Sequence, residues 1–206
     1  GVAASPRVGS GLSVPRGGGY YKVGSPYTVA GRRYFPTETP QRVQKGRASW
    51  YGAAFHGRKT ANGEIYDMNH LTAAHKTMPL PSYARVTNLQ NNHTIVVRVN
   101  DRGPFSYNRI IDLSKRAADL LGFTRAGTAQ VRVEYLGPAP LHGQDDAYLA
   151  STFSRSKKGG FPIPRRPSFT RPALISAYAA PDASAYATQR IEAAFGIDDK
   201  SHNWKR

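Results

Sequence analysis

Short runs of apolar residues separated by polar turns predict a small β-rich domain between residues 46 and 137. Val131, Val133 and Tyr135 alternate with Arg132 and Glu134, which is the period of a strand with one buried face. The run Ile95–Val99 is apolar enough for a buried strand, and Gln90–Asn92 predicts the tight turn before it. Further short strands or apolar steps are predicted at 47–52, 71–75, 83–89 and 109–113.

One short helix is expected inside this β-rich domain. Ser114 has the right chemistry to cap a helix over Lys115–Leu121, and Gly122 would end it. Its apolar face carries alanines and leucines. Five or six short strands with one helix in about 90 residues are typical of a small β-barrel, so the fold class expected here is mainly β.

The segments on either side of the domain lack this periodicity. Residues 1–24 are rich in Gly, Pro and Ser and predict a flexible leader, and residues 25–45 predict a flank with a short hairpin over 27–36. Residues 138–206 are dominated by Pro, Ala, Ser, Arg and Tyr, and they predict a largely disordered basic tail with a helical segment near 187–195.

Charge and composition narrow the class of partner. The chain has 206 residues with 29 Lys and Arg against 13 Asp and Glu, giving a net charge of +16 that no single run carries. This excess of positive charge favours an anionic partner such as nucleic acid, anionic lipid or cell wall. There is no cysteine, which excludes disulfides and thiolate metal sites. No apolar run reaches the ~18 residues of a membrane helix, and no signal-peptide pattern stands at Gly1.

The stretch Thr94–Ser114 brings chemistry to this framework. The predicted strand at Ile95–Val99 runs into Asn100-Asp101-Arg102-Gly103-Pro104, which puts a carboxylate where a strand ends. Loops held by rigid strands often carry catalytic groups, although Asn, Asp, Gly and Pro are also ordinary turn residues. Asp112 follows the second apolar run and precedes the predicted helix.

Five separate blocks in residues 46–137 closely resemble the rare lipoprotein A family. They appear in the family's order and cover about half of the chain. The blocks are Ala48–Gly52 (ASWYG), Phe55–Glu64 (FHGRKTANGE), Leu71–Pro81 (LTAAHKTMPLP), Val97–Phe105 (VRVNDRGPF) and Ile111–Ser114 (IDLS).

This resemblance implies a six-stranded double-psi β-barrel and a bacterial envelope enzyme. Family members are lytic transglycosylases that cleave peptidoglycan glycan strands, preferably those stripped of stem peptides. The implied location is the periplasm or cell envelope, with outer-membrane association through a lipidated cysteine. This chain has no cysteine, and residues 138–206 do not resemble the family's glycan-binding repeat. Anchoring and septal targeting therefore do not follow from the resemblance.

The family's three important positions correspond to Glu64, His75 and Asp101. A lytic transglycosylase protonates the leaving oxygen and then takes a proton from the sugar's own 6-hydroxyl, so one group serves as acid and then as base. Asp101 is the expected acid/base. Glu64 is expected to stabilise the cationic transition state or to tune Asp101, and the alternative is a solvated loop carboxylate. His75 is expected to bind a carboxylate or a sugar, and the alternative is a structural bond to backbone.

Other residues are expected to bind substrate. A neighbouring guanidinium lowers the pKa of a carboxyl, and a general acid needs a pKa high enough to stay protonated. Arg102 is therefore expected to point away from Asp101, toward substrate or another acid. Trp50 and Tyr51 could stack on sugars, but alternation allows only one of them to face a groove. Asp112 is a second site carboxylate or a structural residue at the helix approach. The substrate-binding residues expected are Trp50, Tyr51, Asn62, Asn100, Arg102 and Asp112.

Three other readings compete with the lytic transglycosylase. One is an expansin-like module that grips glycan without cutting it, and another is an inverting hydrolase using Glu64 and Asp101 across a water. A nucleic-acid binder would need a recognition helix or aromatic motif that the sequence lacks.

The histidines do not have the spacing of a helical metal motif, so neither a metal nor another cofactor is expected. The partners expected are glycan strands and cell-division or envelope proteins, with the chain itself a monomer.

Overall fold

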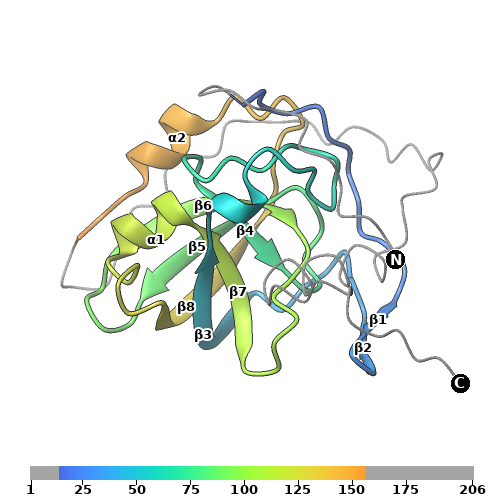
Figure 1. Ribbon diagram of the computed structural model, residues 1–206, viewed down its shortest axis with the longest axis horizontal. Coiled ribbons are helices and arrows are strands. Elements are labelled where there is room, and N and C mark those ends of the chain that lie inside the picture. The colour runs from blue at the N-terminus through green and yellow to red at the C-terminus, as the bar shows by residue number, and fades with distance from the viewer. Residues whose placement is uncertain (1–13, 156–206) are drawn as a thin grey trace, which may run out of the picture.

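Six strands of the chain close into one β-barrel (Figure 1). The structure, a computed structural model, describes residues 14–155. The predictions for residues 1–13 and 156–206, including the helical segment near 187–195, lie outside the described residues. The described elements, in chain order, are β1 (Tyr27–Val29), β2 (Arg32–Tyr34), β3 (Val43–Tyr51), the 3₁₀ turn η1 (Ala53–Phe55), β4 (Thr72–His75), β5 (Ser82–Asn88), β6 (Thr94–Asp101), β7 (Arg109–Ser114), α1 (Lys115–Leu121), β8 (Thr128–Pro138) and α2 (Asp146–Ser151).

The barrel has the strand order β3-β7-β4-β6-β5-β8. The pairs β3/β7 and β4/β6 are parallel, and the remaining pairs in the ring are antiparallel. This closed, six-stranded, mixed ring is the expected double-psi β-barrel, so the mainly β fold class is confirmed. Ring closure removes the sheet edges that would otherwise be open to pairing.

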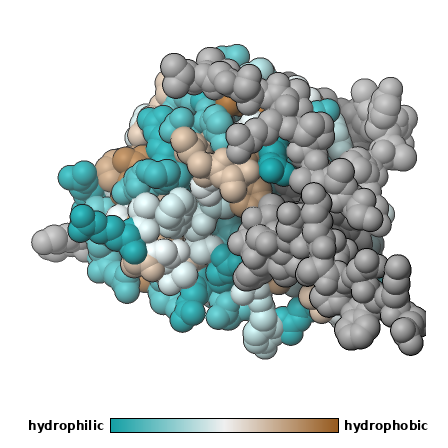
Figure 2. Space-filling view, viewed as in Figure 1, coloured by the Kyte–Doolittle hydropathy of each residue, from teal (hydrophilic) through white to brown (hydrophobic). Residues whose placement is uncertain are grey.

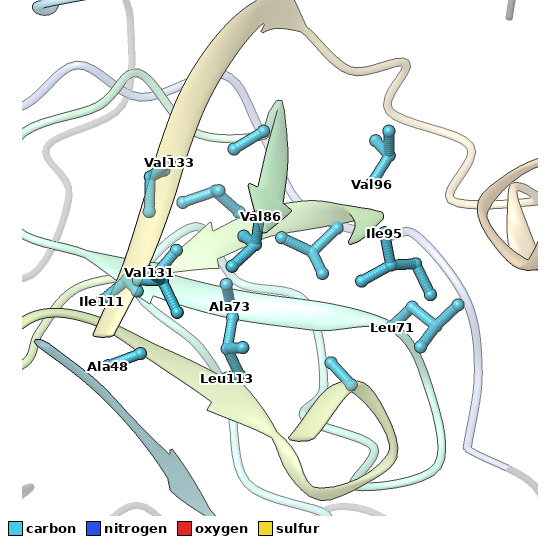
Figure 3. Packing of buried hydrophobic residues seen from close by; sticks show 14 of the residues in the cluster. Ala48, Leu71, Ala73, Val86, Ile95, Val96, Ile111, Leu113, Val131 and Val133 are labelled. Carbon is cyan, nitrogen blue, oxygen red and sulfur yellow. The ribbon is translucent and has the colours of Figure 1, made fainter. Parts of the chain in front are cut away.

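The barrel interior is filled by small and β-branched side chains that alternate along the strands. Val86, Ala73, Leu113 and Val131 point toward one another between the strands in Figure 3, and each is fully buried. Side chains of successive residues leave opposite faces of a strand. The residues between these core positions therefore face outward, where the chemistry-bearing side chains lie.

The helix α1 matches its predicted bounds and caps. Ser114 Oγ accepts a hydrogen bond from the N–H of Ala117, and Gly122 ends the helix in the left-handed region at φ 78°. The buried residues Ala117, Ala118 and Leu121 form its apolar face. Local capping signals therefore located this element correctly.

The strands β6 and β8 differ from the sequence expectation. The strand β6 continues to Asp101, two residues into the expected polar turn. In β8 the alternation holds through Val133, but Glu134 is buried and Tyr135 is only half-buried. Glu134 still faces outward opposite Arg85 of β5, and the guanidinium groups of Arg85 and Arg132 that donate to its carboxylate cover it, while Tyr135 packs only partly against the core.

The ordered structure extends beyond both expected domain boundaries. In the segment expected to be a flexible leader, Val14 is buried and Lys22 forms a β-bridge with Leu80. In the segment expected to be a disordered tail, α2 packs on β6 and buries Leu149. Tertiary contacts order both segments although their own sequences carry little periodicity.

The hairpin β1–β2 is the element expected within residues 27–36, and it lies against the barrel as expected. Tyr27 and Tyr34 stack at 5.3 Å between ring centroids, and Phe105 packs edge-on against both. The Tyr27 hydroxyl donates to the Lys76 carbonyl at 2.7 Å.

Figure 2 shows that brown apolar patches on the viewed face are small and separated. No described helix has the length and apolar character needed to cross a bilayer.

Candidate active site

Two carboxylates share one outward-facing row across four neighbouring strands. Asp101 of β6 pairs with Ala74 of β4, Ala74 pairs with Asp112 of β7, and Asp112 pairs with Ser49 of β3. Register partners project from the same face of a sheet. The neighbours of these residues along the strands, such as Ala73, Leu113 and Ala48, lie in the barrel core. We call Asp101, Ala74, Asp112 and Ser49 the carboxylate row.

A β-bulge brings Asp101 into this row. The β4/β6 pairing shifts between Ala73 and Ala74, because Ala73 pairs with Val99 and Ala74 pairs with Asp101. Asn100 is the extra residue, and its Nδ2 donates to Glu64 Oε2 at 2.8 Å. Bulges next to functional sites redirect side chains. Here the bulge lets two consecutive residues, Asn100 and Asp101, both serve the outer face.

Backbone amides hold the carboxylate of Asp101. Its Oδ1 accepts hydrogen bonds from the N–H of Ala61 at 3.0 Å and from the N–H of Arg102 at 2.8 Å. Asp101 is buried, with an exposed fraction of 2%. The loop before Glu64 and the turn after β6 therefore fix the direction of this carboxylate.

Asp112 is held by side chains instead. The Ser49 hydroxyl donates to Asp112 Oδ1 at 2.5 Å, and Arg109 Nη1 donates to the same oxygen at 3.0 Å. Arg109 also contacts Ser49 Oγ. The Asp112 side chain is 8% exposed and that of Arg109 is 26% exposed. This end of the carboxylate row therefore reaches the surface through Arg109.

Glu64 lies in a separate, fully buried cluster. Arg98, which has no exposed surface, donates through Nε to Glu64 Oε2 at 3.0 Å and through Nη2 to Oε1. Asn62 Nδ2 donates to Oε1 at 3.1 Å. Burial alone raises the pKa of Glu64, but the hydrogen bonds and charge of Arg98, with those of Asn100 and Asn62, outweigh it and lower that pKa below its usual value. Glu64 is therefore an ionised partner of Arg98 and not a solvated loop carboxylate.

A second acid shares Arg98 with Glu64. Asp145, just before α2, accepts from Arg98 Nη1 at 3.1 Å and from the Tyr83 hydroxyl at 2.9 Å. His70 Nε2 lies 3.0 Å from its other oxygen. Burial raises the pKa of Asp145, and the bonds to His70, Arg98 and Tyr83 more than reverse this effect. We call Glu64, Arg98 and Asp145 the buried ion cluster.

The N-terminal segment covers this cluster. A Cβ on Gly19 would lie 2.7 Å from the carbonyl oxygen of Asn62 and 2.8 Å from Cγ of Glu64, so only glycine allows this approach. The N–H of Tyr20 donates to the Asn62 carbonyl at 3.0 Å. Arg16 bridges Asp67 and Asp146 on either side. The segment expected to be a leader therefore closes over the Glu64 loop.

His75 lies on the core-facing side of β4. By register it pairs with Ile111, which is a core residue, whereas the adjacent Ala74 belongs to the carboxylate row. Its Nδ1 accepts hydrogen bonds from the N–H groups of Thr77 and Met78, both at 3.1 Å. Burial, followed by the charges of Arg102 and Lys76, lowers the pKa of His75 to about 3. His75 is thus neutral and bonds to backbone N–H groups, as in the structural alternative, and its catalytic role stays a prediction.

The guanidinium of Arg102 binds backbone carbonyls, and its expected role in substrate binding stays a prediction. Its guanidinium donates to the carbonyls of Met78 and Val23, both at 2.6 Å, and to that of His75 at 3.3 Å. It is 1% exposed. Burial lowers its pKa to about 10, against the opposing charges of Tyr27 and Asp101. The side chain ties the N-terminal segment to the turn after β4.

Asn62, Trp50 and Tyr51, which were also expected to bind substrate, lie in three different surroundings. Asn62 has no exposed surface, and its Oδ1 accepts from Thr60 Oγ1 and from the N–H of Glu64, which shapes the loop. Trp50 packs on the core side with Nε1 donating to the Thr124 carbonyl. Tyr51 lies on the outer face, stacked on Tyr66 with ring centroids 4.3 Å apart. Alternation thus separated the two aromatics as expected.

Sequence reasoning missed four site residues. Arg98 carried a usable signal, because a charge inside the apolar run 95–99 needs a buried partner. Asp145 carried no such signal in its own surroundings. Ser49 and Arg109 join the site through strand register alone, which a single sequence does not reveal.

A three-residue group could be mistaken for a metal site. His70, Asp145 and Asp146 have ligand atoms within 4.8 Å of one another. Arg98 and Arg16 already pair with the two carboxylates in direct hydrogen bonds. A divalent cation would have to displace these guanidinium groups, so the donor set does not fit a resident metal.

Known proteins match the barrel and its flanks. The family described as lytic transglycolase matches residues 43–133. The endolytic peptidoglycan transglycosylase RlpA of Neisseria meningitidis is 56% identical over 127 residues, covering 60% of this chain and 53% of the relative. The protein of the same name from Pseudomonas aeruginosa (strain UCBPP-PA14) is 54% identical over 121 residues, covering 58% and 36%.

The chain spans about half the length of the first of these curated relatives and about a third of the second. Among solved structures, an expansin of Clavibacter michiganensis matches with a TM-score of 0.37 and 19% identity, over 48% of this chain and 52% of that one. That likeness is too distant to carry an argument. Residues 43–133 are therefore a double-psi β-barrel domain that belongs to the lytic transglycolase family.

Proposed function

We propose that the protein is an endolytic peptidoglycan lytic transglycosylase. It cleaves the bond between N-acetylmuramic acid and N-acetylglucosamine and leaves 1,6-anhydro ends. The carboxylate row carries this proposal, because Asp101 and Asp112 flank the small side chain of Ala74 on one face of the barrel. The similarity to the endolytic peptidoglycan transglycosylase of Neisseria meningitidis supports the same activity.

Asp101 is the acid/base in this proposal. Its carboxyl protonates the leaving glycosidic oxygen and then accepts the proton of the muramic 6-hydroxyl, whose oxygen closes the anhydro ring on C1. No water enters the reaction. The amides of Ala61 and Arg102 hold one carboxyl oxygen in place, and such positioning of a reacting group lowers the barrier.

The other carboxylates assist from their own positions. Asp112 stabilises the positive charge that develops on the sugar ring, since an oriented anion acts strongly where water is excluded. Asn100 has a buried Oδ1 with no hydrogen-bond partner among the described residues, and it is suited to accept a sugar hydroxyl. Glu64 acts through Asn100 and the Ala61–Glu64 loop, so it is a positioning residue for Asp101.

The proposed setting follows from the substrate. Peptidoglycan glycan strands are the partner, and the site of action is the periplasm or cell envelope. Cell-division or envelope proteins are proposed as further partners, the chain acts as a monomer, and no cofactor takes part. Outer-membrane attachment would need a lipid anchor outside this sequence.

Cleavage in ¹⁸O-water tests the proposal directly. The product should carry 1,6-anhydro-N-acetylmuramic acid without label, because the nucleophile is the sugar's own hydroxyl. One labelled oxygen at each new reducing end would favour an inverting hydrolase with Glu64 as base. Absence of any product from peptide-bearing and stripped strands alike would favour an expansin-like binding module.

The variant Asp101→Asn should lose at least the roughly 10²–10⁴-fold that general acid–base catalysis supplies. Its amide oxygen can still accept from Ala61 and Arg102, so glycan binding and melting temperature should stay close to wild type. Glu64→Gln should lose less activity per folded molecule. Equal activity of Asp101→Asn and wild type would refute the assigned role.

A further inference from the structure

A row of cations lies next to the carboxylate row on the same face. Arg47 of β3 pairs with Arg109 of β7. Arg47 precedes Ser49 by two positions, and two positions along a strand return to the same face about 7 Å away. Lys76 comes directly after β4, and its charge interacts with those of Asp112 and Arg109. We call Arg47, Arg109 and Lys76 the cationic row.

The hairpin and the loop before β7 extend this row with an aromatic ring. The Arg32 guanidinium lies 3.8 Å from the ring centroid of Tyr107, which is 75% exposed. Lys76 Nζ donates to the carbonyl of Ser106 at 3.2 Å. The packing of Phe105 on Tyr27 and Tyr34 fixes the hairpin against this loop. The Arg32 cation and the exposed ring of Tyr107 therefore lie together next to the cationic row.

The electrostatics of the row are those of an anion site. Burial lowers the pKa of Lys76, and the charges of Arg32 and Arg109 lower it further, while Asp112 acts in the opposite direction. These cations are therefore close enough to repel one another. Holding like charges together costs stability, and an anionic ligand would relieve that cost.

We propose that the cationic row, with Arg32 and Tyr107, is a subsite for carboxylates carried by the glycan strand itself. The ligand group is the lactyl carboxylate that a muramic residue exposes once its stem peptide has been removed. This proposal rests on the proposed function, because it places the muramic carboxylate beside the residues assigned to the reacting sugar.

The short distance between the two rows favours the lactyl group over a peptide carboxylate. A lactyl carboxylate is joined to its sugar by one ether oxygen and one carbon, so it stays near the glycan backbone. The two rows meet where Arg109 Nη1 lies 3.0 Å from Asp112 Oδ1, and Arg47 lies two strand positions, about 7 Å, from Ser49. Both separations are within the span of one or two sugars. Peptide carboxylates lie several rotatable bonds farther from the ring, where ordering them costs more entropy.

Binding by a non-cleaving protein tests the subsite apart from the chemistry. The full chain with Asp101→Asn would be titrated with labelled soluble strands from amidase-treated sacculi. The same strands would be titrated after carbodiimide coupling converts their carboxylates to methylamides. Arg47→Gln with Lys76→Gln should raise the Kd for carboxylate strands roughly threefold to tenfold, as expected for two partly exposed ion pairs. The methylamide strands should show no change.

A matched variant controls for net charge. Arg125→Gln with Arg155→Gln removes two positive charges from other exposed positions. It should change the Kd much less, and the salt dependence of binding should fall only for the cationic-row variant. An equal loss from both variants would show a general charge effect and overturn the subsite.

Two further results would overturn the lactyl assignment. One is equal binding of carboxylate and methylamide strands by the parent protein. The other is an equal loss, in the cationic-row variant, on peptide-bearing strands, whose lactyl groups are tied up in amide bonds. Failure of the proposed function appears elsewhere, as absence of anhydro product from the wild-type chain, and it does not alter these binding results.

Discussion

The carboxylate row and the buried ion cluster use the same chemical groups in opposite ways. Glu64 and Asp145 both bond to Arg98, whose side chain has no exposed surface. Asp101 is held by two backbone amides, and Asp112 by a hydroxyl and the partly exposed Arg109. In the cluster two acids share one buried guanidinium, while the Asp112 end of the row reaches the protein surface through Arg109.

This difference separates scaffolding from chemistry. Taking one partner from a buried ion pair leaves an uncompensated charge and destabilises the fold. Changing a carboxylate that is held by amides to its own amide keeps the hydrogen bonds and removes the proton chemistry. We therefore expect variants of the cluster to affect stability first and variants of the row to affect activity first.

Truncation to residues 25–137 should give the largest effect. It removes Asp145 from Arg98 and also removes Leu149 and the N-terminal segment over Glu64. Loss of one buried ion partner and one buried leucine should together cost about 5 kcal/mol or more, which is comparable with the whole stability of a small domain. Urea unfolding would measure this. Residues 14–155 are the control and should unfold like the full chain, and equal midpoints for both fragments would contradict the cluster's role.

Arg98→Met should be the most costly single change. Methionine keeps much of the volume but leaves Glu64 and Asp145 buried without a cation, at an expected cost of about 3–5 kcal/mol in the free energy of unfolding. Adding Glu64→Gln and Asp145→Asn should recover part of that loss. Arg47→Met, at an exposed strand position, should stay within about 0.5 kcal/mol of wild type. A similar loss in the free energy of unfolding for Arg47→Met and Arg98→Met would show that the buried ion cluster matters no more for stability than an exposed arginine.

His75 should make the fold sensitive to acid. The folded state holds His75 neutral with a pKa of about 3, whereas in the unfolded chain the side chain has the ordinary histidine pKa of 6.5. Its stabilisation is therefore complete above pH 6.5 and falls by up to about 1.4 kcal/mol per pH unit as pH drops toward 3. Unfolding at pH 7 and pH 5 should differ by about 2 kcal/mol.

His75→Asn provides the control for this pH effect. The asparagine Oδ1 can accept from Thr77 and Met78 without titrating, so the dependence between pH 7 and pH 5 should flatten. Glu64 and Asp145 have lowered pKa values, so their stabilisation is present above their unfolded pKa values, near 4, and is lost only at lower pH. An unchanged slope in His75→Asn would assign the acid sensitivity to other groups.

Chelation should have the smallest effect. Arg98 and Arg16 occupy the carboxylates of Asp145 and Asp146, so EDTA should leave both the melting temperature and glycan cleavage unchanged. Activity that disappears in EDTA and returns with zinc would show that His70, Asp145 and Asp146 bind a metal after all.

Local signals in the sequence predicted much of the fold. The caps of α1 follow from Ser114 and Gly122, because capping depends on hydrogen bonds within a few residues. The buried strands follow from runs such as 95–99, because burial on both faces requires apolar side chains. The family resemblance implied the barrel's class and the importance of Glu64 and Asp101.

Only the tertiary structure decided which of these residues belong together. The register of β6, β4, β7 and β3 joins Asp101 to Asp112 and Ser49, and the bulge at Asn100 turns Asp101 outward. Asp145 meets Arg98 across 47 residues of sequence. Pairing between distant strands and partner choice for buried charges depend on the whole packed arrangement, and the order of residues along one chain does not encode them locally.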